Sequence, residues 1–491
     1  MPEESHLERE RRAKIARWRA EGREPFPWSF PDRMLIRDVR ALTAPLAPGA
    51  EATDRTARVA GRLTTVRTHG GTSFIDLEDL SGRLQLLLTV HELGEETYRR
   101  WLADLDPGDI IGAVGVPAVS RRGEPSLRVE SLELLAKAIS PPPEKFHGLQ
   151  DPEERIRRRY LDLMSSAESR DRFRVRSLLT REIRGYFDAA GFLEVETPIL
   201  LHVAGGAAAT PFVTHSRYLD AELQLRIAIE LSLKPLLVGG LERVYEIGRC
   251  FRNEDLDTTH SPEFTMLELY WAYADYYDMR RMMEGLYERL GARILEWQPD
   301  SEAAQRAAKL FHAPFPTLDF VQALEERSGI HDILAKSPEE LGELARRCGA
   351  TVPTDSPPGV FLDKLFEHYV EPTIDRPTFV VDHPASTTPL AKRHRSLAGR
   401  VERFEIHYRG FELGNCYTEL NDPDEQEQRF QAQLAGRGGD RYAYDAEFVE
   451  ALRYGMPPAT GIGFGIDRIA MALTGAASIK DVLLFPQVRP R

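Results

Sequence analysis

The loop from Arg252 to His260 holds the densest group of side chains in this sequence that could do chemistry. It begins with an arginine and contains three carboxylates before the histidine. Strand-like apolar runs flank it at 243–249 and 264–270. A guanidinium has a planar fork that suits phosphate or carboxylate, and buried charges need a partner or a ligand. The pattern therefore predicts a strand–loop–strand unit that binds an anion.

A second polar group contains three glutamates at intervals of seven residues, Glu405, Glu412 and Glu419. Two strands joined by a turn at Arg409 and Gly410 would bring the first two glutamates together. Because Mg²⁺ takes a few carboxylates in combination with phosphate oxygens, this pair could form a magnesium site. The alternative is that these glutamates are solvent-facing charges on a strand, and the residues alone leave both interpretations open.

A third group is the glycine-rich run 461–473, which has glycines at alternate positions and then Asp467 and Arg468 at the start of a helix. Glycine at such positions lets another backbone or a flat ligand approach a strand closely. The run lacks the lysine of a phosphate-binding P-loop. Considered alone, it predicts only a turn from a strand into a helix.

A fourth group, residues 205–234, places Glu230 in an apolar setting. A carboxylate at that position could cap a helix. It could also receive the ammonium group of a ligand, because a buried carboxylate needs a partner. The residues around Glu230 do not decide between these two roles.

The elements that must position these groups follow from the apolar patterns of residues 151–491. Helical patterns occupy 169–191 and 277–291, and 300–375 is predicted to be a helical insertion. Strand patterns predominate around the polar groups, at 243–249, 264–270, 377–382, 402–408 and 411–419. These patterns predict an α+β domain built on a mainly antiparallel sheet that is flanked by helices.

A smaller domain is predicted at 55–138, where short strand patterns with glycine-containing turns surround one helical segment at 93–105. This arrangement is typical of an OB-fold β-barrel, a common oligonucleotide binder. The proline-rich stretch 139–150 is predicted to be a hinge. Residues 1–54 comprise a charged helix at 5–24 and a connector. The charge pattern favours a solvated amphipathic helix, and a basic arm that touches an RNA backbone is the alternative.

The composition limits the class of protein. A chain of 491 residues, 42% hydrophobic and 29% charged, is ordinary for a globular protein with more than one domain. The net charge of -13 argues against non-specific nucleic-acid binding by the whole surface and leaves room for a local basic face. Three unevenly spaced cysteines show no disulfide or zinc pattern and fit a cytoplasmic location. No apolar window approaches the length of a membrane span, so no membrane partner is expected.

Several ordered motifs resemble those of the class II aminoacyl-tRNA synthetases. The segments FLEVETPIL, FRNEDLDTTHSPEF and GIGFGIDRIA are similar to the three signature motifs of that class. Within the class, the lysyl-tRNA synthetase family is similar over nearly the whole chain, including RRRYLDLM, AGGAAATPFVTH, TPLAKRH, TELNDP and EALRYGMPP. The resemblance implies an OB-fold anticodon-binding domain, a class II catalytic domain, and a ligase that activates L-lysine with ATP and transfers it to tRNA(Lys).

The resemblance also implies roles for single residues. Arg252 and Arg468 would be the catalytic cations, and Glu405 and Glu412 would hold Mg²⁺. The ATP site would comprise Arg252, Glu254, His260, Phe264, Glu405, Glu412 and Arg468. The lysine site would comprise Gly206, Glu230, Arg252, Glu268, Tyr270, Asn415, Tyr417 and Glu419. The anticodon would be recognised by Phe74, Gln85 and Glu124, and the interface of a homodimer would contain Pro198. For Phe74 alone, the residues favour a place in the barrel core.

Some positions depart from the family pattern. Ile229 and Ser232 stand where Pro and Tyr are usual, and Cys416 and Tyr417 stand where a small residue and Phe are usual. None of these changes removes a charged residue of the implied sites. We therefore expect the same reaction with an altered pocket shape and inhibitor sensitivity, as in a divergent member or a second copy of the enzyme.

Two other functions are compatible with part of this motif pattern. A paralogue could activate lysine or an analogue and pass it to a protein side chain, but such paralogues lack the anticodon barrel that is predicted here. A synthetase fold without activity could serve as an RNA-binding or regulatory module. Intact Arg252, Glu405, Glu412 and Arg468 argue against that second reading.

Overall fold

The chain forms two compact units, residues 1–149 and 150–491. A computed structural model describes residues 4–143, 149, 151–207, 209–254, 256–354, 356–435 and 445–489. Much of the hinge expected at 139–150 therefore lies outside the described residues. Nowhere in the described ranges is there a helix both long and apolar enough to cross a membrane.

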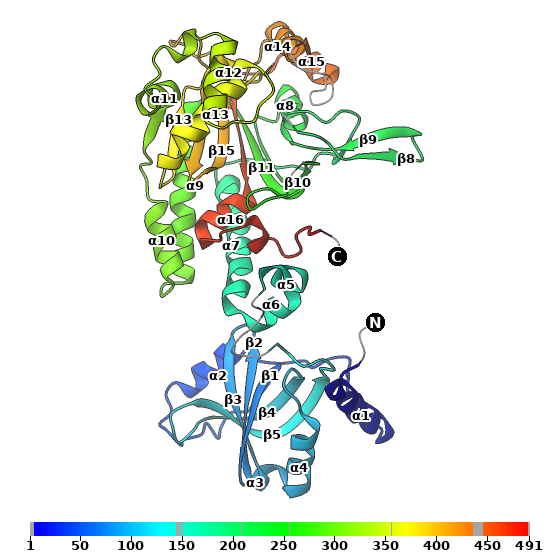
Figure 1. Cartoon of the computed structure of the whole chain (residues 1–491). Coiled ribbons are helices and arrows are strands. Elements are labelled where there is room, and N and C mark those ends of the chain that lie inside the picture. The colour runs from blue at the N-terminus through cyan, green and yellow to red at the C-terminus, as the bar shows by residue number, and fades with distance from the viewer. Residues whose placement is uncertain are drawn as a thin grey trace. The chain divides into compact units, whose positions relative to one another are not determined.

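The N-terminal unit contains a closed five-stranded barrel (Figure 1). Its strands follow the order β1-β2-β3-β5-β4, with bounds β1 Ala57–His69, β2 Thr72–Asp79, β3 Gly82–Thr89, β4 Ile110–Val119 and β5 Pro125–Ala136. Between β3 and β4 lie α3 Val90–Leu93 and α4 Glu95–Asp104. Alternate residues of β3, Leu84, Leu86 and Leu88, are fully buried in the barrel. The predicted OB-fold is confirmed.

The charged N-terminal helix, α1 His6–Ala20, packs onto this unit. The indole Nε1 of Trp18 donates to Asp104 Oδ2 over 2.8 Å, and Lys14 Nζ lies 2.9 Å from Asp106 Oδ2. Arg11 donates to the carbonyl oxygen of Ala138 over 2.8 Å. Arg11 and Lys14 of α1 therefore interact with residues of the N-terminal unit itself. The expected connector also contains a helix, α2 Ile36–Thr43, whose Ile36 and Val39 are fully buried.

The C-terminal unit is built on an eight-stranded sheet in the order β12-β13-β14-β15-β16-β11-β10-β6 (Figure 1). The two pairs β12–β13 and β10–β6 are parallel and the other neighbours are antiparallel. The strand bounds are β6 Leu193–Glu194, β10 Arg243–Phe251, β11 Glu263–Ala272, β12 Thr317–Asp319, β13 Thr378–Val381, β14 Arg403–Tyr408, β15 Phe411–Thr418 and β16 Ala459–Gly465. A small second sheet has the order β7-β9-β8, with β7 Leu200–Leu201, β8 Val213–Ser216 and β9 Ala221–Leu225. The predicted α+β class with an antiparallel-rich sheet is confirmed.

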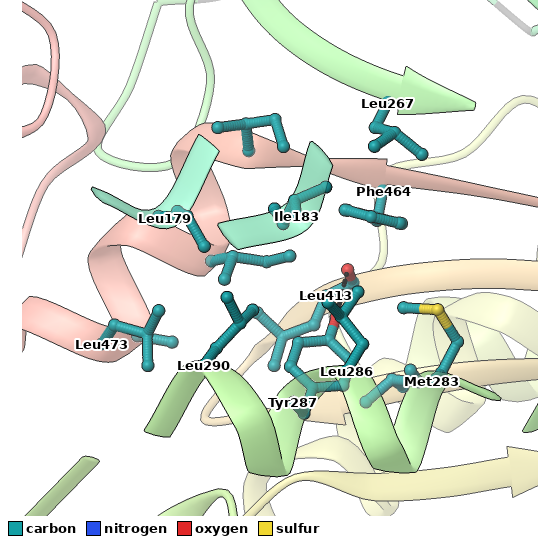
Figure 2. Packing of buried hydrophobic residues seen from close by; sticks show 14 of the residues in the cluster. Leu179, Ile183, Leu267, Met283, Leu286, Tyr287, Leu290, Leu413, Phe464 and Leu473 are labelled. Atoms are coloured by element: carbon teal, nitrogen blue, oxygen red, sulfur yellow. Dashed lines mark hydrogen bonds between the residues drawn. The ribbon is translucent and has the colours of Figure 1, made fainter. Parts of the chain in front are cut away.

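One face of this sheet carries the main hydrophobic core. The helices that cover it are α7 Ala167–Ala189, α9 Tyr276–Trp297 and α16 Ile466–Thr474. Figure 2 shows Leu179 and Ile183 of α7 near Leu286 and Leu290 of α9, with Phe464 of β16 beside them. Each such buried side chain stabilises the fold by about 1.5–3 kcal/mol. Because the apolar residues of the strands face this layer, the alternate residues face the other side of the sheet.

The other face is partly covered by α8 Glu230–Val238, which packs against β10, β11 and α15 Ala446–Arg453. The remaining helices are α5 Pro152–Arg157, α6 Arg159–Ser165, α10 Glu302–Leu310, α11 Phe320–Ser328, α12 Pro338–Arg347, α13 Pro358–Tyr369 and α14 Pro423–Ala435. Between α10 and α13, the segment expected to be a helical insertion also contributes β12 to the edge of the sheet.

Candidate active site on the polar face of the sheet

Cross-strand register brings residues from distant parts of the chain into one row. Glu405 of β14 pairs with Asn415 of β15, which pairs with Gly463 of β16. Gly463 pairs in turn with Glu268 of β11, and Glu268 with Glu246 of β10. Because directly opposed residues point to the same side of a sheet, these side chains share one face.

A second row on this face holds the aromatic members of the site. Tyr417 pairs with Gly461, and Gly461 pairs with Tyr270. A Cβ atom at Gly461 would collide with the ring of Tyr270 and with Oε1 of Glu419, and a Cβ at Gly463 would lie 2.9 Å from Cε of Met266. The alternate glycines of β16 therefore make room on the sheet for the side chains of the neighbouring strands.

Three buried glutamates converge next to these rows. Glu230 is the first residue of α8, Glu268 lies on β11, and Glu419 follows β15; they are 6%, 3% and 0% exposed. Glu268 accepts hydrogen bonds from the backbone N–H of Ile229 over 2.8 Å and from the hydroxyl of Tyr270 over 3.0 Å. A group of three buried carboxylates favours a cationic partner.

One such partner is Lys234, which the sequence analysis did not single out. Its Nζ lies 2.5 Å from Oε1 of Glu230 and 2.5 Å from Oε2 of Glu419. The spacing of four residues between Glu230 and Lys234 on α8 was the available signal. The hydroxyl of Tyr417, one of the unusual residues, donates to the same Oε1 of Glu230. Despite the ion pair, neither oxygen of Glu419 accepts a hydrogen bond of ordinary geometry from the described part of the chain.

Burial makes two of these carboxylates, Glu268 and Glu419, weaker acids. Burial raises the pKa of Glu268 to about 7, and the nearby charge of Glu230 adds to the shift. Burial also raises the pKa of Glu419 to about 8, with Lys234 opposing the shift and Glu230 adding to it. A cationic ligand would stabilise both carboxylates in their ionised form. We call the group Glu230, Lys234, Glu268, Tyr270, Tyr417 and Glu419 the carboxylate pocket.

Two arginines lie where an anion could bind. Nε of Arg252 donates to the carbonyl oxygen of Ile227 over 3.2 Å, and its guanidinium carbon lies 5.1 Å from the centre of the Phe264 ring. Arg468 donates to the carbonyl oxygen of Glu412 over 3.2 Å and lies 3.3 Å from Nε2 of His260. Neither guanidinium forms an ion pair with a carboxylate of the described residues. Each therefore retains N–H donors for a phosphate or carboxylate ligand.

The residues expected to hold Mg²⁺ meet at the hairpin of β14 and β15. Glu412 lies opposite His407, whose Nε2 lies 2.7 Å from Oε2 of Glu405. The other oxygen of Glu405 accepts a hydrogen bond from Arg403. Burial raises the pKa of Glu412, and the charge of Glu405 adds to the shift, so a cation between the two carboxylates would be stabilised.

The chemistry of this pair fits a metal that arrives with phosphates. The described residues contain no group of three or more His, Cys, Asp or Glu that could hold a metal by itself. Mg²⁺ is commonly bound by one or two carboxylates together with phosphate oxygens and water. Arg403 and His407, which sequence reasoning missed, are the groups that orient Glu405.

The other expected residues come from several different elements. Gly206 has φ +84, and a Cβ there would lie 3.3 Å from Cβ of Glu230, so glycine suits this contact. Asn415 accepts a hydrogen bond from Nε of Arg403 over 3.0 Å. Glu254 is exposed and accepts one from the backbone N–H of Thr210 over 3.2 Å. Pro198 lies between β6 and β7.

On the barrel, the residues expected to recognise the anticodon lie on or beside the outer surface. Phe74 is partly exposed, whereas its neighbours Ser73 and Ile75 are fully buried, so Phe74 faces outward. Its strand neighbour Asp76 pairs with Gln85 of β3. Ser126 donates to Oε1 of Gln85 over 3.2 Å and to the backbone carbonyl of Glu124 over 2.9 Å. The alternative that Phe74 belongs to the barrel core is wrong.

Similarity to known proteins covers both units. Residues 151–489 match the family of tRNA synthetases class II (D, K and N), and residues 57–135 match the OB-fold nucleic acid binding domain. Lysine–tRNA ligases from Roseiflexus castenholzii and Carboxydothermus hydrogenoformans are 45% and 42% identical, each over 99% of both chains. The lysine–tRNA ligase of Deinococcus radiodurans is 45% identical over 96% of this chain and 91% of its own length. The chain belongs to the lysine–tRNA ligase family of the class II tRNA synthetases.

Proposed function

We propose that the chain is a lysine–tRNA ligase that activates L-lysine with ATP and transfers the lysyl group to the 3′ end of tRNA(Lys). The observation that carries this proposal is the carboxylate pocket, above all Glu419, which is fully buried and accepts no hydrogen bond of ordinary geometry from the described residues. Oε2 of Glu419 lies beside Nζ of Lys234, and a substrate ammonium would supply a donor to Oε1. The full-length similarity to lysine–tRNA ligases supports the same substrate.

In the proposed complex, the pocket binds the ammonium groups of lysine and the arginines bind the anionic groups. Glu268, Tyr270 and Glu419 face the ε-ammonium, while Gly206, Glu230 and Asn415 orient the α-amino and carboxylate groups. The α-carboxylate of lysine attacks the α-phosphorus of ATP in line, pyrophosphate leaves, and lysyl-adenylate forms. No side chain has to become a nucleophile, so positioning and charge neutralisation account for the rate.

Arg252 would contact both the lysine carboxylate and the α-phosphate, which brings the two reacting groups together. Phe264 would stack on the adenine and Glu254 would contact its edge, while His260 and Arg468 would contact the γ-phosphate. Glu405 and Glu412 would hold Mg²⁺. When bound, Mg²⁺ neutralises phosphate charge, which lowers the barrier to attack by another anion.

The charge state of the pocket predicts a pH dependence of lysine binding. The raised pKa values of about 7 for Glu268 and about 8 for Glu419 mean that both carboxylates gain protons as the pH falls through this range. The ε-ammonium of lysine stays protonated throughout, because its ordinary pKa is about 10.4. The KM for lysine should therefore rise at least about tenfold from pH 8 to pH 6, and the KM for ATP much less. A constant KM for lysine over this range would show that neither carboxylate binds the substrate.

The second step needs tRNA, and the barrel offers a surface for its anticodon. Phe74 would stack on an unpaired base, and Gln85 and Glu124 would contact base edges, as in other proteins that bind single-stranded loops. Arg67 of β1 and Arg83 of β3, both about half exposed, each form an ion pair with Asp76 of β2 and together outnumber its negative charge.

Substitution of Phe74 by alanine should separate the two steps. Loss of one stacking platform costs on the order of 1–3 kcal/mol of RNA binding, so kcat/KM for tRNA should fall about 5- to 100-fold. Lysine-dependent exchange of pyrophosphate into ATP should remain at the wild-type rate, because Phe74 belongs to the N-terminal unit and the groups proposed for activation belong to residues 150–491. Parallel losses in exchange and charging would contradict a role confined to tRNA.

We also propose a homodimer whose interface contains Pro198. Leu193, Ile199, Leu200 and Val213 around it are 52%, 41%, 49% and 57% exposed, which is a large apolar area for the surface of a monomer. Sedimentation of the full chain as a monomer at micromolar concentration would contradict this interface. Because tRNA charging serves protein synthesis, we place the enzyme in the cytoplasm.

The function itself is tested in two assays on the purified chain. Exchange of pyrophosphate into ATP should require lysine, and tRNA(Lys) should then accept labelled lysine. Exchange without tRNA charging would point instead to an enzyme that transfers lysine to a protein. An absence of lysine-dependent exchange would contradict the proposal altogether.

A further inference from the structure

Lys234 is a lysine whose whole side chain is buried inside the C-terminal unit. It is 0% exposed, and its Nζ forms ion pairs with two buried glutamates of the carboxylate pocket, Glu230 and Glu419. Three aromatic rings surround it, with Nζ at 5.9 Å from the ring centre of Tyr270, 5.4 Å from Tyr417 and 5.7 Å from Phe448. Removing a lysine from water costs several kcal/mol unless charged partners replace the water. This cost suggests that the buried lysine has a function in the pocket.

The geometry ties two glutamates from different elements to one atom. Oε1 of Glu230 on α8 and Oε2 of Glu419 beyond β15 both lie 2.5 Å from Nζ, so the two oxygens are no more than twice that distance apart. The second oxygen of each carboxylate has no hydrogen bond from a described residue. Oε1 of Glu419 is buried and lies 2.4 Å from the position that a Cβ atom of residue 461 would take, so glycine at this position leaves room beside the oxygen. Lys234 thus holds one oxygen of each glutamate and leaves the other for a ligand.

The charges of the pocket also fit this arrangement. Glu230, Glu268 and Glu419 contribute three negative charges when ionised, and Lys234 contributes one positive charge. The remaining two negative charges equal the two ammonium groups of free lysine, whose carboxylate would be bound by Arg252. An amino acid with only one ammonium group would leave a buried carboxylate without a counter-charge, which is strongly unfavourable.

We propose that Lys234 is a specificity-determining residue, a fixed internal cation that orients Glu230 and Glu419 and sets the pocket charge to match a diamino acid. It acts through these two glutamates and is a positioning residue. This inference rests on the proposed function, because it assumes that lysine occupies the pocket.

The pH dependence of lysine binding should report this role. The ionisable groups that face Lys234 are Glu230 on α8, Glu268 and Tyr270 on β11, and Tyr417 and Glu419 on and after β15. Of these, Glu419 has its pKa lowered by Lys234 against the effect of burial. Without the lysine, Glu419 should hold its proton to a higher pH, and lysine binding would require a more alkaline solution.

The test compares Lys234→Met with the wild-type enzyme and with Lys137→Met. Lys137 is the matched control, because its side chain is 1% exposed and its Nζ lies 2.7 Å from Asp109 in the N-terminal unit. Lysine-dependent exchange of pyrophosphate into ATP gives KM for lysine and for ATP across a range of pH. In Lys234→Met, we expect KM for lysine to rise on the order of a hundredfold while KM for ATP stays within about threefold. The acidic limb of kcat/KM for lysine should move up by about one pH unit or more.

Lys137→Met should lose thermal stability, but its KM for lysine and the acidic limb of its pH profile should stay as in the wild-type enzyme. If Lys234→Met does not fold, Lys234→Gln, which keeps a polar head group, takes its place with the same expectations. An unchanged ratio of the two KM values and an unmoved pH profile, as in the control, would overturn the inference. Absence of lysine-dependent exchange in the wild-type enzyme would instead overturn the proposed function, so the two failures are distinguishable.

Discussion

Replacing Arg252 by alanine should reduce kcat/KM for lysine-dependent exchange by about a thousandfold or more. In the proposed complex this guanidinium contacts both the lysine carboxylate and the α-phosphate, so its loss removes the alignment and the charge neutralisation together. It forms no ion pair with a described carboxylate of the chain, and the fold should tolerate the change. Pyrophosphate exchange measures the loss of activity, and the melting temperature measures any loss of stability.

Arg347→Ala is the control for this experiment. Arg347 lies on α12 with its side chain 76% exposed, and the one ion pair that it forms among the described residues, with Glu343, has a length of 3.8 Å. Such a surface ion pair contributes little to the free energy of unfolding, so the variant should fold and retain wild-type exchange. A well-folded Arg252→Ala enzyme that exchanges within about threefold of wild type would mean that Arg252 does not contact the reacting groups.

The Glu419→Gln variant should lose lysine binding selectively. The amide keeps the size of the side chain and removes the charge that faces both Lys234 and the proposed ε-ammonium. Two cations would then share the remaining carboxylates, and KM for lysine should rise on the order of a hundredfold or more, since breaking a buried charge pair costs about 3–5 kcal/mol. The KM for ATP should change by less than about threefold, because the phosphates are bound by other residues.

Glu450→Gln on the exposed side of α15 is the control, because this glutamate faces solvent on a helix that packs against α8. It should leave both KM values unchanged. Equal losses for lysine and ATP in Glu419→Gln would mean that Glu419 supports the fold of the site and does not bind the substrate.

The strands around the polar groups could be predicted because runs rich in apolar and aromatic residues alternate with polar loops and turns along the chain. The hairpin of β14 and β15 followed from Arg409 and Gly410, which both have positive φ values, 47 and 82, as a tight turn requires. What the alternation does not determine is which strands become neighbours. The row from Glu405 to Glu268 depends on β16 lying between β15 and β11, although β16 is far from β11 in sequence. Only the resemblance to a known family anticipated this convergence.

Lys234 and α2 show where sequence reasoning failed. A lysine on a helix is usually solvated, and the apolar setting of Glu230 did not show that α8 packs against both β11 and α15. The helix α2 was hidden because it is short and lies in a segment rich in Pro and Ala. Phe74 illustrates the reverse case, since an aromatic residue on a strand suggested a core position and the barrel places it outside.

The most direct test of the account compares lysine with norleucine in the exchange of pyrophosphate into ATP by the wild-type enzyme. Norleucine has a similar chain length and no ε-ammonium, so it would leave one negative charge of the carboxylate pocket buried without a counter-charge. The account predicts rapid exchange with lysine and a kcat/KM for norleucine lower by at least about a thousandfold. Comparable exchange with both amino acids, or none with lysine, would contradict the claim that the buried carboxylates of this pocket bind the lysine side chain.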